Sequence, residues 1–289
     1  MAVTVNWSGS YNGLAWGVGT NVQFNSIKGL RAHPGQRSGD IPKGRQDGVN
    51  AGLNYLNARI FTIEMMPFNP TVAFETVVAS ITSAFQPIMD PTFQFPFEFL
   101  LPGWSTSRII NCRCTNGAID VDAAFQYYKS VIPIEMTAAD PLIYGSTLKG
   151  AGPTGLPTPT AGLTFPVSYD VVFGASAGGS FVVTNNGNYL TPPVFTIVGP
   201  MTNPKVTFTS TGQFFGSNIS LAAGDVLVID MGARTVFLNG TGYRYNTVMN
   251  GSSWWGIPVG TWSIGLSSSD SAVIAGNFTV NYRDAWGFM

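Results

Sequence analysis

Short apolar segments separated by turn residues make up the second half of the chain. Between residues 205 and 211 the side chains alternate, with Val206 and Phe208 on one side and Thr207 and Thr209 on the other. A period of two is typical of strands with one buried and one solvated face. The segments expected as strands are residues 165–173, 180–184, 193–198, 205–210, 218–221, 225–230, 234–239, 261–267 and 277–282. A series of short strands without a helix predicts a two-sheet sandwich of the jelly-roll or galectin type.

The first half mixes strands with one helix. The helix is expected over about residues 70–86, with Asn69 as N-cap, Pro70 in its first turn and Pro87 after its end. Its apolar positions recur at helical spacing and form one face: Phe74, Val77, Val78, Ile81, Ala84 and Phe85. Strands are expected at residues 3–7, 58–65, 93–101, 105–116 and 124–138. We expect the helix to cover an otherwise open sheet.

The stretch between the two halves is rich in Gly, Pro and Thr, which is typical of a linker. We therefore expect a first domain over residues 1–145, a linker over 146–163 and a second domain over 164–289. The predicted fold class is mainly β. An N-terminal β-sandwich or sheet with one packing helix precedes a galectin-like, jelly-roll β-sandwich.

Charge is scarce along the whole chain. Only 10% of the residues are charged, against roughly 25% in an average soluble domain, and the formal net charge is −1. Near-neutrality gives no electrostatic reason to expect nucleic acid or a membrane as partner. It does suit a subunit whose faces are covered in an assembly. The N-terminus lacks the pattern of a signal peptide and no apolar run is long enough to span a membrane, so we expect synthesis in the cytoplasm.

Groups that could carry catalysis are few. His33 is the one histidine and lies in a Gly/Pro stretch, without a partner motif or a Gly-x-Ser-x-Gly elbow. No phosphate-binding loop and no histidine pair for a metal are found. Cys112 and Cys114 share one face of a predicted strand, too constrained for a disulfide and too few for zinc. We expect no catalytic, cofactor-binding or metal-binding residues.

Two carboxylates, Asp120 and Asp122, lie two residues apart on a predicted strand and would therefore share a face. Paired carboxylates can cleave glycosides when they are about 5 to 9.5 Å apart. A solvated strand face is the simpler interpretation.

One cluster of basic residues stands out between residues 28 and 45. Its members are Lys28, Arg31, Arg37, Lys43 and Arg45. The cluster is interpreted either as a solvated loop or as an extended arm that reaches an acidic surface on a neighbouring subunit. Nucleic-acid binding ranks third, because no aromatic residue is interleaved.

Trp254 and Trp255 form the second candidate contact site, in a loop rich in Gly, Ser and Asn. Exposed aromatic pairs stack on sugar rings or anchor protein interfaces. Burial of at least one of the two in the core is the alternative.

The order of several motifs resembles one protein family, the distal tail proteins of long-tailed, non-contractile bacteriophages (siphovirus-type tail components, or minor tail proteins). In the first half the resemblance lies in GLRAHPGQRSGDIPKGRQDG, ARIFTIEM, the helix, FEFLLPG, SRIINCRC and MTAADPLIYG. In the second half it lies in LTFPVSY, PVFTIVGPMTNPKVTFTSTG, LAAGDVLVIDMGARTVFLNG and VNYRDAW. Together these motifs cover most of the chain.

The resemblance implies a ring-forming N-terminal domain, six copies of which close a ring at the end of the tail tube, and a galectin-like outer domain. It implies the tail tube protein, the hub or tape-measure protein and adsorption proteins as partners, with DNA passing through the lumen and the virion as location. It implies no enzyme activity, no cofactor, no sequence-specific nucleic-acid contact and no membrane insertion. The alternatives are a carbohydrate-binding tail adhesin that recognises host glycans through Trp254 and Trp255, and a wall-degrading enzyme that uses Asp120 or Asp122.

Overall fold

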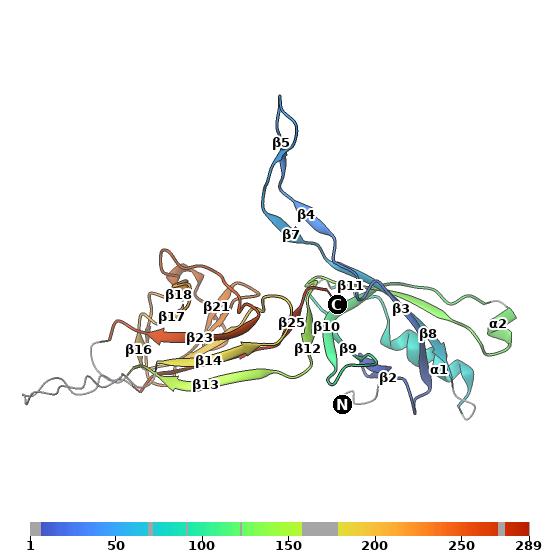
Figure 1. Ribbon diagram of the computed structural model, residues 1–289. Coiled ribbons are helices and arrows are strands. Elements are labelled where there is room, and N and C mark those ends of the chain that lie inside the picture. The colour runs from blue at the N-terminus through green and yellow to red at the C-terminus, as the bar shows by residue number, and fades with distance from the viewer. Residues whose placement is uncertain are drawn as a thin grey trace, which may run out of the picture. The chain divides into compact units, whose positions relative to one another are not determined.

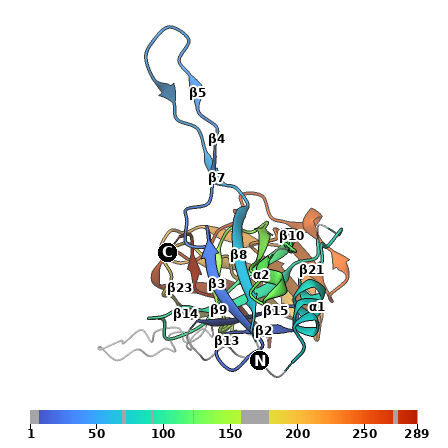
Figure 2. The same cartoon turned by 90° about the vertical axis from the view of Figure 1, so that its right-hand side faces the viewer.

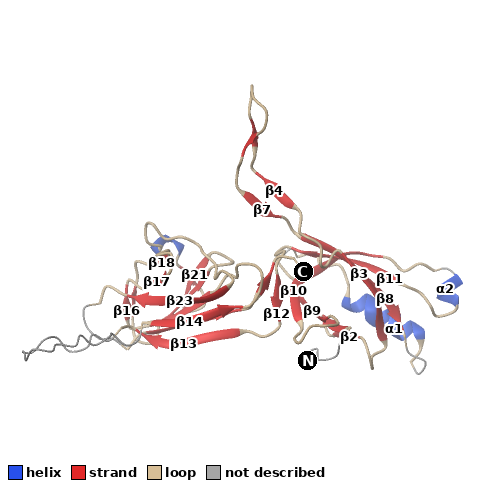
Figure 3. Cartoon of the chain, viewed as in Figure 1, coloured by secondary structure: helices blue, strands red, loops and turns tan. Residues whose placement is uncertain are grey.

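The computed structural model describes residues 7–68, 72–90, 92–121, 123–157, 179–270 and 275–288, with only the backbone at positions 124 and 126 (Figure 1). Contacts between Cα atoms divide the chain into two units. Unit 1 comprises Met1–Ser146 together with Trp286–Met289, and unit 2 comprises Thr147–Ala285. Strands dominate both units (Figure 3).

Unit 1 is built on one antiparallel sheet with the strand order β2-β1-β9-β10-β11-β8-β3; β12 pairs with β10 and β25 with β12. Its strands are β1 (Ser8–Tyr11), β2 (Leu14–Trp16), β3 (Val22–Lys28), β8 (Arg59–Pro67), β9 (Phe95–Leu100), β10 (Arg108–Gly117), β11 (Ile132–Ala138), β12 (Ile143–Gly145) and β25 (Ala285–Trp286). Every second residue of β11 is buried. The sheet therefore buries one face, as its alternating sequence predicts.

Helix α1 (Phe74–Ala84) packs on the core of unit 1 through Val77, Ile81 and Ala84. It is shorter than expected: Ala73 is the N-cap, with an extended ψ of 131°, and no side chain caps the helix. The predicted capping residues, Asn69 and Pro70, lie outside the described residues.

The segment 124–138, expected as one strand, divides into a short helix α2 (Ala123–Gln126) and the strand β11. Tyr128 ends the helical turn: its N–H donates to the Phe125 carbonyl at 3.0 Å, and its φ is 59°. The left-handed conformation breaks the extended backbone. The residues before β11 lack the alternation of apolar and polar side chains that strand pairing on a core requires.

Aromatic side chains fill the core of unit 1. The ring of Trp16 stacks on that of Phe97 at 5.0 Å, and Tyr11 stacks on Phe85 at 4.8 Å. Gly9 allows this packing, because a Cβ at this position would lie 2.5 Å from Trp16 Cζ2 and 2.4 Å from the Glu98 carbonyl oxygen. Only glycine fits between the strand and the indole ring.

A buried arginine ties distant backbone segments of unit 1 together. Arg59 is 2% exposed. Its guanidinium donates to four carbonyl oxygens: Leu30 (2.7 Å), Ala32 (2.6 Å), Pro141 (2.8 Å) and Gly287 (2.5 Å). Burial lowers the pKa of Arg59, and the charge of Asp140 opposes this shift. Because Gly287 is among the acceptors, Arg59 holds the end of the chain in unit 1.

Arg108 supports the same C-terminal segment. Its guanidinium lies between the rings of Trp104 (3.9 Å) and Trp286 (3.7 Å). Burial lowers the pKa of Arg108 to about 10, and the nearby charge of Arg31 acts in the same direction. The group still carries its charge at neutral pH, so both indole rings make cation–π contacts with it.

Unit 2 is a sandwich of two antiparallel sheets. The larger sheet has the order β13-β24-β15-β20-β21-β22 and the smaller the order β14-β23-β17-β18. The strands of the larger sheet are β13 (Lys149–Gly155), β15 (Val194–Val198), β20 (Val226–Asp230), β21 (Thr235–Leu238), β22 (Gly242–Tyr243) and β24 (Asn277–Tyr282). The strands of the smaller sheet are β14 (Ser180–Asn185), β17 (Lys205–Phe208), β18 (Phe214–Gly216) and β23 (Gly260–Ser267). A separate pair is formed by β16 (Met201–Thr202) and β19 (Ser220–Leu221). The 3-10 helix η1 is Tyr245–Thr247.

Side chains from both sheets share one core in unit 2, with Phe195, Ile197 and Phe278 from the larger sheet and Phe208 and Ile264 from the smaller. The alternation of apolar and polar residues therefore predicted correctly which face of these strands is buried. The strand at residue 205 ends at Phe208, whose carbonyl accepts the Gly212 N–H at 2.9 Å in a turn. The fold class predicted from the sequence is confirmed: mainly β, with one long helix and several antiparallel sheets.

The linker expected at residues 146–163 is in part a strand. Residues 149–155 form β13, which pairs with β24 across a β-bulge between Ala151 and Thr154. Gly and Pro are compatible with this position because β13 is an edge strand and contains a bulge. Residues 158–178 lie outside the described residues, as do the strands expected at 165–173 and at 3–7, apart from Trp7.

An ion-pair cluster joins β3 to β8. The carboxylate of Glu64 pairs with the Lys28 ammonium and accepts hydrogen bonds from Ser26 Oγ (2.7 Å) and Asn25 Nδ2 (2.9 Å). These hydrogen bonds, the one from Lys28 foremost, lower the pKa of Glu64 from 4.5 to about 2. The charged carboxylate thus favours the folded state.

We expect acid to remove this contribution. A carboxylate whose pKa is lowered in the folded state adds stability above its unfolded pKa and loses it as the pH falls, here between about 4.5 and 2. Glu64→Gln should therefore reduce the loss of stability across this range, measured as the unfolding midpoint in urea against pH. The control is Glu75→Gln, at an exposed position on α1. An unchanged acid slope in the Glu64 variant would contradict the assignment.

Candidate interaction surfaces

A long hairpin leaves the sheet of unit 1 between β3 and β8 (Figures 1 and 2). It is formed by β4 (Gln36–Ser38) paired with β7 (Asn54–Leu56) and by β5 (Ile41–Pro42) paired with β6 (Val49–Asn50). Every residue from 35 to 55 is exposed. We call residues 35–57 the arm. An exposed two-stranded ribbon is at best marginally stable in water, so the arm fits a role in contacts with another molecule.

Local contacts shape the arm. The Asp40 carboxylate accepts the Gly52 N–H at 2.7 Å, across the two strands. Gly52 is needed there, since a Cβ would lie 2.2 Å from the Gly39 carbonyl oxygen. The guanidinium of Arg37 lies 5.4 Å from the ring centroid of Tyr55.

The basic residues singled out in the sequence divide into two groups. Arg37, Lys43 and Arg45 lie on the arm and are exposed. Lys28 is the last residue of β3, before the arm begins, and pairs with Glu64 of the same chain. Arg31 is exposed in the turn that follows β3. The suggestion that all five residues bind a neighbour stays a prediction, and the arm itself contributes three of them.

Sequence reasoning missed the apolar side chains of the arm. Four large ones are exposed: Ile41 (65%), Val49 (51%), Leu53 (74%) and Tyr55 (51%). The arm also carries Asp40 and Asp47, so its excess of basic charge is small. A set of exposed apolar residues on one element indicates a binding surface. The sequence did hold a signal for this surface: an apolar residue lies on each side of a Gly-rich turn, in a segment that has no core to bury it.

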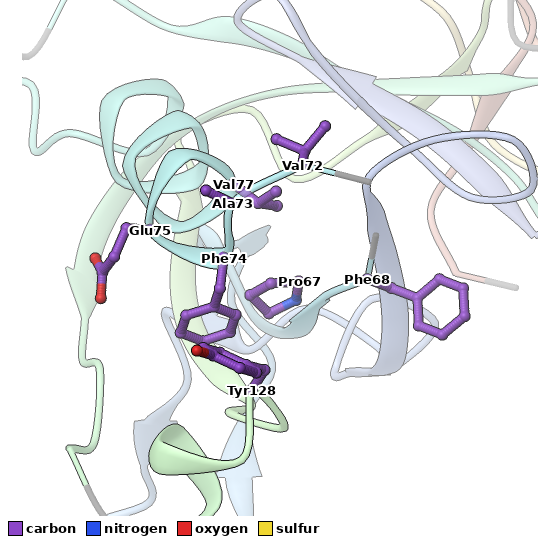
Figure 4. A pocket seen from close by; sticks show the side chains of 8 residues that line it. All are labelled: Pro67, Phe68, Val72, Ala73, Phe74, Glu75, Val77 and Tyr128. Carbon is purple, nitrogen blue, oxygen red and sulfur yellow. The ribbon is translucent and has the colours of Figure 1, made fainter. Parts of the chain in front are cut away.

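A second surface lies at the start of α1. An apolar pocket of about 600 Å³ is lined by Pro67, Phe68, Val72, Ala73, Phe74, Glu75, Val77 and Tyr128 (Figure 4). The Phe74 ring contacts Tyr128 (5.2 Å between centroids) and Phe125 (5.1 Å). Phe68 and Glu75 point away from the pocket in Figure 4. Phe74 was expected on the buried face of the helix, but it is only half-buried and contributes to this surface instead.

The groups considered for catalysis do not come together. Within the described ranges, no group of three His, Cys, Asp or Glu residues could hold a metal ion. His33 is exposed, with Nδ1 2.9 Å from the Pro34 carbonyl oxygen. Asp120 lies in an exposed loop after β10, not on the expected strand, because β10 ends at Gly117; Asp122 lies outside the described residues.

Both cysteines are free and buried on one face of β10. Burial raises the pKa of Cys112, and the neighbouring Cys114 adds to the shift. Burial also raises the pKa of Cys114. The thiolate, which is the reactive form, is therefore disfavoured at neutral pH, and the two residues act as small apolar side chains of the core.

The two tryptophans occupy different environments. Trp255 is 7% exposed and packs between Phe195 and Phe208, at 5.4 Å from each ring. Trp254 is half-buried and contacts Phe215 at 4.4 Å. Both line one pocket of about 400 Å³ together with Leu190, Pro192, Gln213, Met231, Arg234, Gly256 and Pro258. One tryptophan buried in the core and one half-buried tryptophan are thus combined at a single site.

Among the described residues no helix is long and apolar enough to cross a membrane.

A search of curated proteins finds no match to the chain. Comparison with solved structures finds several matches. The Dit protein of phage SPP1, described as a paradigm of the hub adsorption apparatus in phages that infect Gram-positive bacteria, has a TM-score of 0.62 and 12% identity, over 96% of this chain and 98% of that chain.

Two structures of the phage p2 baseplate in its activated conformation are also similar. The one with Ca has a TM-score of 0.48 and 11% identity, over 93% of both chains; the one with Sr has a TM-score of 0.46 and 11% identity, over 95% of this chain and 97% of that chain. The fold assignment rests on SPP1 Dit. Residues 186–286 also match a family model, the siphovirus-type tail component, C-terminal domain. The family resemblance expected from the sequence is therefore confirmed: residues 186–286 match the siphovirus-type tail component C-terminal domain, and the chain is similar in fold to SPP1 Dit over 96% of its length.

Proposed function

We propose that the protein is a structural subunit of a phage tail tip, in which six copies form a ring between the tail tube and the hub. The family match of residues 186–286 carries this proposal, because that family consists of siphovirus-type tail components. The similar fold of SPP1 Dit, a protein of a hub adsorption apparatus, supports it. DNA passes through the lumen of the ring on ejection.

Unit 1 supplies the ring contacts in this proposal. Residues 35–55 of its arm are all exposed, and four large apolar side chains among them are in contact with water. A chain that keeps such a surface gains stability when a neighbouring copy covers it. Arg37, Lys43 and Arg45 then steer the arm toward an acidic surface of the neighbour.

The partners follow from the position of the ring. It contacts the tail tube protein on one side and the hub, tape-measure and adsorption proteins on the other. The protein is made in the host cytoplasm and resides in the virion. The low charge content, 10% of residues, suits faces that meet other subunits. The role we propose is structural and non-enzymatic, because the matched family consists of siphovirus-type tail components.

The oligomeric state tests this proposal. Native mass spectrometry of the purified full-length chain should find a species six times the 30.8 kDa mass of one chain, and negative-stain images should show rings. A strictly monomeric protein at high concentration, without rings, would overturn it. Antibody labelling of intact virions should place the protein at the distal end of the tail.

A further inference from the structure

We propose that unit 2 binds a glycan carrying a phosphate or carboxylate group, in the pocket beside Trp254 and Trp255. This goes beyond the structural role proposed above and does not depend on ring formation. The pocket, called here the tryptophan pocket, has a volume of about 400 Å³, within the roughly 300–1,000 Å³ of small-ligand sites. It combines fixed aromatic rings, an indole N–H without a partner and one cationic side chain.

Four loops of unit 2 build the tryptophan pocket, one of which contributes Gln213 between β17 and β18. Leu190 and Pro192 precede β15, and Met231 and Arg234 belong to the turn between β20 and β21. The two tryptophans lie in the loop before β23. Because the loops connect strands of a packed sandwich, the pocket is formed before a ligand arrives, which lowers the entropy lost on binding.

Fixed aromatic rings supply the stacking surface. Trp254 packs on Phe215 at 4.4 Å and stacks on Tyr245 at 6.2 Å, with an angle of 17° between the ring planes. Its ring is held by these contacts while part of it stays exposed. The C–H face of a pyranose is apolar and stacks on such a ring, and a ring that is already ordered loses little freedom when it binds.

An indole N–H without a partner indicates a polar ligand. The Nε1 atom of Trp255, a lining residue of the pocket, is buried and makes no hydrogen bond within the described chain. Buried indole N–H groups nearly always have a partner in native proteins. A sugar hydroxyl is an acceptor of the kind that this N–H lacks.

Arg234 selects for negative charge. It lines the pocket, is exposed, and pairs with none of the described carboxylates. Its backbone is left-handed, with φ of 55°. The turn is held by Asp230 Oδ1, which accepts the N–H groups of Gly232 and Ala233 at 2.8 Å each. A guanidinium presented on a fixed turn forms paired hydrogen bonds with a phosphate or carboxylate.

A glycan array tests the proposal with the full-length protein. The probes are neutral hexose chains, N-acetylhexosamine chains, uronic-acid chains and sugar-phosphate polymers. We expect binding to acidic members, followed by calorimetric titration with the strongest binder and its uncharged counterpart. Trp254→Ala and Arg234→Asn should each weaken binding by at least about tenfold. Asparagine is chosen at position 234 because it tolerates the left-handed backbone.

Matched variants separate recognition from folding. Trp254→Phe retains an aromatic ring and should retain most of the binding, and Arg244→Ala removes an arginine of the same unit outside the pocket and should change nothing. Removal of the acidic group from the glycan should weaken binding to the native protein but not to Arg234→Asn. Circular dichroism and thermal unfolding verify the fold of each variant.

Two results would overturn the proposal. The first is absence of binding to every array member. The second is binding that Trp254→Ala and Arg234→Asn leave unchanged although both variants are folded. If the array stays negative while the same variants lose a contact with another tail protein, the pocket is a protein-docking site and the glycan assignment is wrong.

Discussion

Replacement of the buried arginine, Arg59→Met, should lower the free energy of unfolding of unit 1 by about 3–5 kcal/mol. Arg59 is 2% exposed and donates to four carbonyl oxygens from three separate parts of the chain. Methionine fills a similar volume but donates no hydrogen bond. The carbonyl groups of Leu30 and Gly287 would then be buried without their donor, and each carries a desolvation penalty of ~1–3 kcal/mol.

Calorimetry of the full-length chain measures this effect. The transition that belongs to unit 1 should shift downward by about 10 °C, at roughly 2–4 °C per kcal/mol for a domain of this size, while the transition of unit 2 stays in place. Arg113→Met is the control, because Arg113 is a half-buried strand residue whose side chain makes no hydrogen bond or ion pair that is seen within the described chain. A loss of less than ~1 kcal/mol in the Arg59 variant would show that the carbonyl groups find other partners.

Truncation of the arm should abolish ring assembly without unfolding the protein. In the variant, residues 39–53 are replaced by Asn-Gly, which closes a two-residue hairpin between β4 and β7. The removed residues are all exposed, so unit 1 loses no part of its core. We expect unchanged unfolding by circular dichroism, but monomers instead of rings in native mass spectra and images.

Smaller changes distinguish the forces that act in the arm. Replacing Ile41, Val49 and Leu53 with serine tests apolar burial, and replacing Lys43 and Arg45 with serine tests charge. Val18→Ser, at an exposed apolar position outside the arm, is the control. If charge dominates, assembly of the native protein should weaken with salt, because the Debye length falls from about 10 Å at 0.1 M to about 3 Å at 1 M. Rings that persist in the truncated variant would exclude the arm as the main contact.

Strands of unit 2 were predictable because their residues alternate over a buried face. Val206 and Phe208 are buried as expected, and Phe278 and Val280 likewise. The period of two reflects the pleat of a strand, which is a local property. The helix was also predictable from its spacing, but its start was not, since Ala73 caps it without a side-chain bond.

Gly and Pro content misled the assignment of the linker, because the same residues occur in edge strands with bulges such as β13. The basic cluster drew attention to the arm region, but its charge did not distinguish a solvated loop from an extended arm. That Lys28 pairs with Glu64 depends on the register between β3 and β8, which joins residues 36 positions apart. Composition alone gave no sign of the four exposed apolar side chains.

Local patterning was enough to establish a mainly β chain with one long helix, a sandwich in the second half and a scarcity of catalytic groups, because alternation, helical spacing and residue types are read along the backbone. The tertiary structure alone placed Arg59 against the carbonyl of Gly287, exposed the arm along its length, and joined Trp254, Trp255 and Arg234 around one pocket. These features depend on contacts between residues far apart in the sequence, and such contacts are formed only when the sheets close over their cores.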